Sequence, residues 1–134
     1  MIETMPSLFI SPAKVCFVIA KARAFDVKDA GTNPDLGFKR ADMRSVPEDN
    51  RDDLTYQELR GFIDALTEDE RVDLVALTWL GRGDGEVYDW DDLREEAARL
   101  HNKRAAQYLL GKPMLADHLE EGLSSLRHFC GAER

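Results

Sequence analysis

The segment from Val72 to Leu80 constrains the fold of this chain more than any other feature of its sequence. Apolar residues occupy nearly all of its sides when it is drawn as a helix, and such a helix is stable in water only when neighbours cover it all round. Thr67 and Glu70 precede it with the spacing of a capping box, in which each side chain accepts a backbone N–H of the other residue. We therefore expect a central, buried helix that begins near Glu68 and ends at Leu80.

Helix signals also precede and follow this segment. Ser11 followed by Pro12 is a typical helix start, because the serine side chain can accept a backbone N–H and proline has none to satisfy. Thr55 and Glu58 have the spacing of a second capping box, and Gly111 is a typical helix end. The other helices expected from these signals cover about residues 12–28, 55–66, 87–110 and 113–129.

The fold class predicted from these patterns is all-α. No segment alternates apolar and polar residues convincingly enough for a strand, so we expect a compact array of about five helices in a single domain over residues 1–134. Residues 1–10 would form an N-terminal tail, and residues 29–54 a long connection between the first two helices. Glycines and prolines interrupt this connection, and both a mobile lid and a slack linker are compatible with it. The short connection at 111–113 predicts that the last two helices pack as an antiparallel pair.

The charge of the chain disfavours several partners. Acidic residues outnumber basic ones by 26 to 18, which gives a net charge of −8 at pH 7. Such a charge repels phosphate backbones and anionic membrane surfaces, so we expect no nucleic-acid or membrane binding. A helix-turn-helix is suggested by the corner at Thr67, but the second helix would present Glu68, Asp69 and Glu70 to the phosphates. No uncharged apolar run reaches the roughly 18 residues that a membrane span needs.

The cysteines and the N-terminus predict a cytoplasmic protein. Cys16 and Cys130 are far apart and outside any Cys-x-x-Cys motif, so neither a zinc ribbon nor a disulfide framework is indicated. We expect two buried free thiols. The first ten residues lack the basic stretch and long apolar core of an export signal.

One group of polar residues could form a ligand site. The Gly81–Gly85 loop allows close approach of a ligand to the backbone, Arg82 offers a planar fork for an anion, and Asp84 or His101 could carry protons. The alternative is a helix that simply ends at glycine, where the partial negative charge repels anions. The Gly81–Gly85 loop and residues 101–104 would meet only if the third and fourth helices crossed in a particular way. The candidate ligand-binding residues are Arg82, Asp84, His101, Asn102 and Arg104.

No catalytic residue, metal site or cofactor is predicted. His118 and Glu121 lie three residues apart on one helical face, but two ligands do not make a metal site. Asp89, Asp91 and Asp92 precede or open a helix, where negative charge complements the helix dipole. Neither a phosphate-binding loop that ends in Gly-Lys-Ser/Thr nor a serine nucleophile elbow occurs.

Several blocks of sequence carry a resemblance to a known family. They are Ser-Pro-Ala-Lys-Val-Cys-Phe at 11–17, Thr-Tyr-Gln-Glu-Leu at 55–59, the segment 74–84, His-Asn-Lys-Arg at 101–104 and Tyr-Leu-Leu-Gly at 108–111. In these blocks the chain resembles the domain-of-unknown-function 3775 family of small bacterial proteins. The resemblance implies a small cytoplasmic bacterial protein and supplies no catalytic residues.

Two classes of function are compatible with these observations. The favoured one is a non-enzymatic protein-interaction or regulatory module, which binds a protein partner or itself through its acidic surface or its first connection. The alternative is a small-molecule-binding protein or enzyme that uses the Gly81–Gly85 loop with His101 and Arg104. The first is favoured because no nucleophile, cofactor motif or complete metal set is recognisable.

Overall fold

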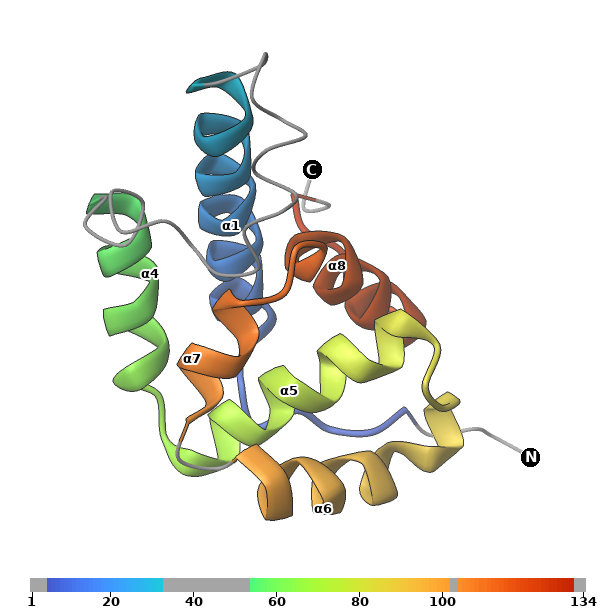
Figure 1. Ribbon diagram of the computed structural model, residues 1–134. Helices are drawn as coiled ribbons and strands as arrows, with labels where there is room; N and C mark the ends of the chain where they lie inside the picture. The colour runs from blue at the N-terminus through green and yellow to red at the C-terminus, as the bar shows by residue number, and fades with distance from the viewer. Residues whose placement is uncertain (1–4, 33–53, 102–103, 132–134) are drawn as a thin grey trace.

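A computed structural model of the chain describes residues 5–32, 54–101 and 104–131. Within these ranges the protein forms six α-helices, one short 3-10 helix and no strand (Figure 1), so the expected all-α fold is confirmed. In chain order the elements are α1 (Pro12–Thr32), α4 (Leu54–Asp64), α5 (Glu68–Arg82), the 3-10 helix η2 (Val87–Asp89), α6 (Trp90–His101), α7 (Ala105–Leu110) and α8 (Leu115–Ser125).

Helix α5 is the centre of the fold, as its apolar surface predicts. It packs against α6, α7 and α8 (Figure 1), and every residue from Val72 to Leu80 is buried. The capping box at its start is present, because the Thr67 side chain accepts the Glu70 N–H at 3.1 Å and the Glu70 side chain accepts the Thr67 N–H at 2.9 Å. The helix continues two residues past Leu80 and ends at Gly83, whose φ of +95° is one that glycine adopts without strain.

Two glycines let α5 and α8 touch backbone to backbone. A Cβ atom on Gly81 would lie 1.7 Å from the carbonyl oxygen of His118, and one on Gly122 would lie 2.3 Å from that of Leu77. No side chain fits at either distance. Gly81 was expected to end a helix, but the structure uses it inside α5 as a contact point.

The single helix expected over residues 87–110 is wrong. The chain forms η2, α6 and α7 there, and Arg104 precedes α7 with non-helical backbone angles. The physical reason is that the two halves are buried against different partners: α6 packs on α5, whereas α7 packs on α4 and α5. Leu100, which a straight helix would have buried, is 52% exposed at the end of α6.

The expected antiparallel pairing of the last two long helices is also wrong. Helix α8 packs against α5 and α1, because the glycine contacts draw it onto α5. The helix expected over 113–129 is shorter than predicted and ends at Ser125. Helix α4 begins at Leu54, one residue before the Thr55 at which the helix was expected to start.

The first helix is longer than expected, and the connection after it begins later in the chain. Helix α1 begins at Pro12 as predicted, and the Ser11 side chain accepts the Lys14 N–H at 3.2 Å. The helix continues to Thr32. The rest of the connection expected over residues 29–54, up to residue 53, lies outside the described residues.

Residues 5–10, the described part of the segment before α1, pack against the core through Met5, Leu8 and Ile10. Ile10 is fully buried, and the backbone N–H groups of Phe9 and Ile10 donate hydrogen bonds to the buried carboxylate of Asp73 on α5. Arg94 of α6 donates to the same carboxylate at 2.6 Å. Burial raises the pKa of Asp73, although the two backbone N–H groups and Arg94 act in the opposite direction. Asp73 therefore ties three parts of the chain together.

The two cysteines form a disulfide bond, so the expected free thiols are wrong. Cys16 lies in α1 and Cys130 lies beyond the end of α8, with their Cα atoms 5.6 Å apart. They are 114 residues apart in sequence. Packing of α1 against α8 brings them together, which no spacing in the sequence could indicate.

Candidate functional site

Three ring side chains meet where α5, the end of α6 and α7 converge. The indole N–H of Trp79 donates a hydrogen bond of 2.9 Å to the phenol oxygen of Tyr108. The His101 ring stacks on the Tyr108 ring with centroids 3.7 Å apart and an angle of 18° between planes. Trp79 also meets His101 edge to face at 5.9 Å. We call Trp79, His101 and Tyr108 the aromatic cluster.

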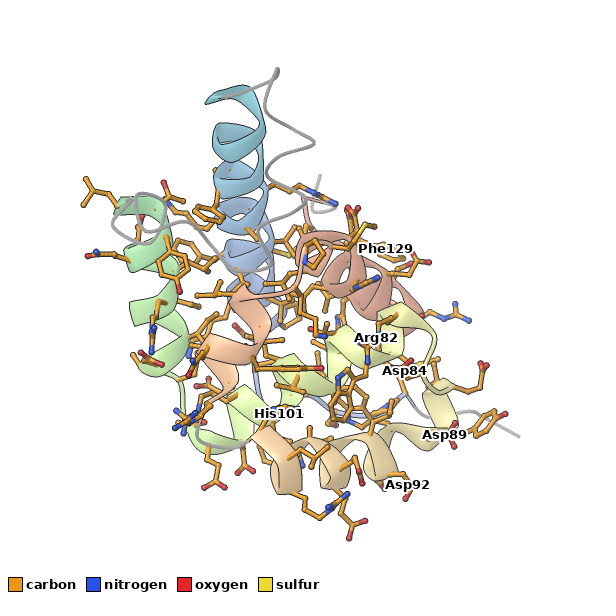
Figure 2. All side chains as sticks on the ribbon, viewed as in Figure 1. Arg82, Asp84, Asp89, Asp92, His101 and Phe129 are labelled. Carbon is orange, nitrogen blue, oxygen red and sulfur yellow. A yellow bond between two sulfur atoms is a disulfide. The ribbon has the colours of Figure 1, made fainter. Side chains whose placement is uncertain are left out.

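Charged groups surround this cluster. The Lys112 ammonium lies 4.5 Å from the centre of the Tyr108 ring, a favourable cation–π distance. Arg82 pairs with Asp84, since its Nε and Nη2 atoms lie 2.8 and 2.5 Å from one carboxylate oxygen. Figure 2 shows this pair at the end of α5 and His101 at the end of α6. Asp84 therefore occupies two of the guanidinium nitrogens of Arg82.

The surroundings shift the pKa of two cluster residues. Burial, followed by the charge of Lys112, lowers the pKa of His101, so the neutral imidazole is favoured at neutral pH. Burial by itself would raise the pKa of Tyr108, but the Trp79 hydrogen bond and the nearby Lys112 and Arg82 cations lower it overall. Among the residues that the structure describes, none accepts the Tyr108 hydroxyl proton in a hydrogen bond.

The candidate residues from the sequence are only partly assembled. Helices α5 and α6 run in opposite directions (Figure 1), and Tyr108 forms the link between Arg82 and His101, since it stacks on His101 and Arg82 lowers its pKa. Arg104 is exposed just before α7. Asn102 lies outside the described residues.

Three residues of the site, Trp79, Tyr108 and Lys112, were not predicted from the sequence. The two aromatic residues fit the core pattern of their helices, and Lys112 lies in the turn after Gly111. A usable signal existed for the aromatic pair, since a buried indole N–H or phenol normally needs a hydrogen-bond partner. No signal in the sequence placed Lys112 beside them.

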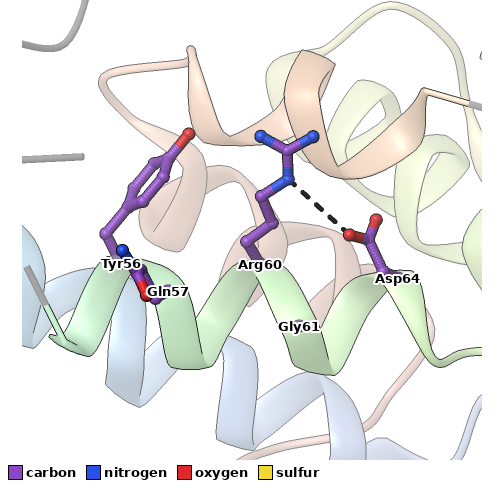
Figure 3. Close-up of a pocket in the computed structure, with 5 residues that line it drawn as sticks. All are labelled: Tyr56, Gln57, Arg60, Gly61 and Asp64. Atoms are coloured by element: carbon purple, nitrogen blue, oxygen red, sulfur yellow. Dashed lines mark ion pairs between the residues drawn. The ribbon is translucent and has the colours of Figure 1, made fainter. Parts of the chain in front are cut away.

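A hollow on the outer side of α4 is a second feature of the surface. It has a volume of about 370 Å³, and its lining comes from this one helix (Figure 3). Arg60 and Asp64 in its lining form an ion pair of 3.6 Å, so their charges offset each other. The other lining residues are Tyr56, Gln57 and Gly61.

Histidine, cysteine and carboxylate side chains are the usual metal ligands of proteins. Across residues 5–32, 54–101 and 104–131, no three such side chains are placed to hold a metal ion. His118 is half-buried in α8, and its Nδ1 atom has no hydrogen-bond partner among the residues that the structure describes. In the same part of the chain, no helix has both the length and the apolar character needed to cross a membrane.

Comparison with known proteins identifies a family. The family model described as "Protein of unknown function (DUF3775)" matches residues 56–127, which is more than half of the chain. This range contains the whole aromatic cluster and Lys112, but neither cysteine. No curated protein and no solved structure gives a significant match. The chain therefore belongs to the DUF3775 family.

Proposed function

We propose that the protein is a non-enzymatic interaction module that binds a protein partner at the aromatic cluster. The observation that carries this proposal is the half-buried Tyr108, which is held by Trp79 and His101 while its hydroxyl proton has no acceptor among the described residues. Tyrosine, tryptophan and arginine are the residues that dominate binding energy in protein interfaces. A rigid ring that carries a hydroxyl group is typical of such a contact.

The surface next to the cluster supplies the remaining parts of an interface. Leu100, beside His101 in the chain, is 52% exposed and offers an apolar contact. The Arg82–Asp84 pair, Lys112 and the exposed Arg104 would form a polar rim around it. A partner that presents a carbonyl or carboxylate to Tyr108 and an apolar side chain to Leu100 would match this arrangement. Neither nucleic acid nor a membrane is part of the proposal, given the net charge of −8.

Photo-crosslinking of the protein inside its native cells tests the proposal. A photo-reactive amino acid at position 100 should give an adduct of one defined mass, and the same amino acid at Leu54 should not. Leu54 is a matched control because it is 81% exposed and lies on α4. An adduct with the mass of two chains would identify self-association instead of a second protein. Equal labelling from both positions, or none from position 100, would contradict the proposal.

A second function is favoured by one specific observation. The Trp79 hydrogen bond and two cationic neighbours lower the pKa of Tyr108, and a neutral imidazole lies against its ring. This arrangement is suited to proton transfer on a bound small molecule. Mass spectrometry of small molecules that copurify with the protein tests it. A compound that the native protein retains and that the Arg82→Ala and Tyr108→Phe variants lose would show that the protein binds a small molecule. The function would then be that of a ligand-binding protein or enzyme and not that of an interaction module.

We also propose a bacterial cytoplasmic location. The support is the resemblance to small bacterial proteins, while the argument from free thiols no longer applies. Disulfides in the cytoplasm are usually transient. At this location the Cys16–Cys130 bond is therefore expected to be transient as well. Fractionation of native cells tests the location, and recovery outside the cytoplasm would contradict it.

A further inference from the structure

The chain turns back on itself directly after α8. Arg127 has a φ of +68°, a left-handed conformation in which glycine is strongly preferred at helix ends. The Arg127 N–H donates to the Ser124 carbonyl and the His128 N–H to the Leu123 carbonyl, both at 2.9 Å. This is the hydrogen-bond pattern of a Schellman motif, with arginine at the glycine position. The turn directs Cys130 toward α1.

We propose that the Cys16–Cys130 bond is a redox-controlled clasp, which holds the segment 127–131 against α1 and releases it when a thiol reductant opens the bond. Arg127, Phe129 and Gly131 of this segment are exposed. Phe129 is 59% exposed, and the helix-end turn depends on an unfavourable arginine conformation. The covalent bond is thus the strongest tether that the structure shows between this segment and the rest of the molecule.

The core does not depend on the clasp in the same way. Leu119, Leu123 and Leu126 of the α8 region are each at most 1% exposed, and the Gly81 and Gly122 contacts hold α8 on α5. Helix α8 therefore stays in place when the segment beyond it leaves. Reduction is expected to be a local change.

The chemistry requires only a thiol reductant. Both cysteines are partly buried rather than enclosed. A thiolate of the reductant attacks one sulfur and breaks the Cys16–Cys130 bond, which forms a mixed disulfide and one free protein thiolate. A second reductant thiolate then releases the other cysteine. In total two electrons and two protons reach the protein, and the two reductant thiols become a disulfide.

Hydrogen exchange on the full chain, oxidised and reduced with dithiothreitol, tests the clasp. Alkylation with N-ethylmaleimide and intact mass first establish the redox state, and the oxidised protein should take up no label. After reduction, the hydrogen-bonded amides of Arg127 and His128 should lose their protection while those of α5 and α8 keep theirs. Protection that persists at these two amides would overturn the proposal, and so would loss of protection throughout the chain or free thiols in the oxidised protein.

Two further measurements separate a switch from a passive crosslink. In a glutathione buffer of cytoplasmic composition, most of the protein should become reduced, and a bond that stays closed would overturn regulation by redox state.

The Arg127→Gly variant removes the unfavourable conformation and leaves both cysteines in place. When reduced, it should keep more protection at residue 128 than the reduced native chain does. Equal loss in both would show that the turn plays no part in release.

Discussion

At the scale of single residues, His101 links the aromatic cluster to pH. Its pKa is lowered from 6.5 by burial and by Lys112, so the folded protein favours the neutral ring more than the unfolded chain does. The stability that it contributes is present above the unfolded pKa of about 6.5 and is lost as the pH falls through the lower folded pKa. Urea unfolding at pH 7.5 and pH 5 should therefore show a smaller difference in His101→Phe than in the native protein. An identical pH dependence in both proteins would contradict this role.

Asp73 is the residue whose loss should cost the fold most. Asp73→Ala would leave the Phe9 and Ile10 N–H groups and the Arg94 guanidinium without their buried acceptor. Breaking such a buried pair typically costs about 3 kcal/mol or more. Asp69→Ala is the matched control, because Asp69 contacts the same Arg94 at 3.4 Å with a side chain 62% exposed, and an exposed pair contributes about 0–1 kcal/mol. Equal unfolding free energies for the two variants would refute the anchoring role of Asp73.

At the scale of helices, the contact between α5 and α8 depends on glycine. Gly122→Ala would place a Cβ atom 2.3 Å from the Leu77 carbonyl oxygen, and forcing the helices apart should cost about 1–3 kcal/mol. Gly61→Ala is the control on α4, where a Cβ atom meets nothing within 4 Å. That change should stabilise the protein by about 0.5–1 kcal/mol, since alanine favours helix more than glycine does. Thermal unfolding distinguishes the two, and a stable Gly122→Ala protein would disprove the close contact.

The end of α8 gives a prediction of the opposite sign. Arg127 holds a φ of +68°, which costs a non-glycine residue roughly 1–2 kcal/mol. Arg127→Gly should recover about 1 kcal/mol, reduced somewhat because glycine also loses more conformational freedom on folding. Guanidinium unfolding of the oxidised proteins measures the gain. A loss of stability would mean that the arginine side chain has a role that outweighs its backbone strain.

At the scale of the whole molecule, the disulfide constrains the unfolded chain. It joins residues 114 positions apart, and the chain-entropy model assigns about 4–5 kcal/mol to a loop of that size. Reduction should lower the unfolding free energy by up to that amount and still leave a folded core. The Cys16→Ser/Cys130→Ser double variant should match the reduced protein and should not respond to dithiothreitol. If dithiothreitol also leaves the unfolding free energy of the native protein unchanged, the bond contributes nothing to stability.

The candidate site was predictable only in part. Arg82, Asp84 and His101 were chosen for their chemical types, and the structure brings them near one another, but Arg82 and Asp84 offset each other's charge. Tyr108, which joins the site together, fits the apolar pattern of its helix and gave no sign of a role in a site. Residue type indicates what a side chain can do. Its neighbours decide whether that capacity is used, and the neighbours come from helices that lie far apart in the sequence.

The sequence by itself determined the helical class, the start of α1 at Pro12, and the start and burial of α5, because caps and apolar periodicity act over a few neighbouring residues. Tertiary structure alone decided where the segment 87–110 breaks, that α8 lies on α5, and that Cys16 meets Cys130. These features depend on which surfaces are buried against each other. Local patterns carry no information about that choice, since an apolar face fits many partners and a glycine contact exists only once two helices have crossed.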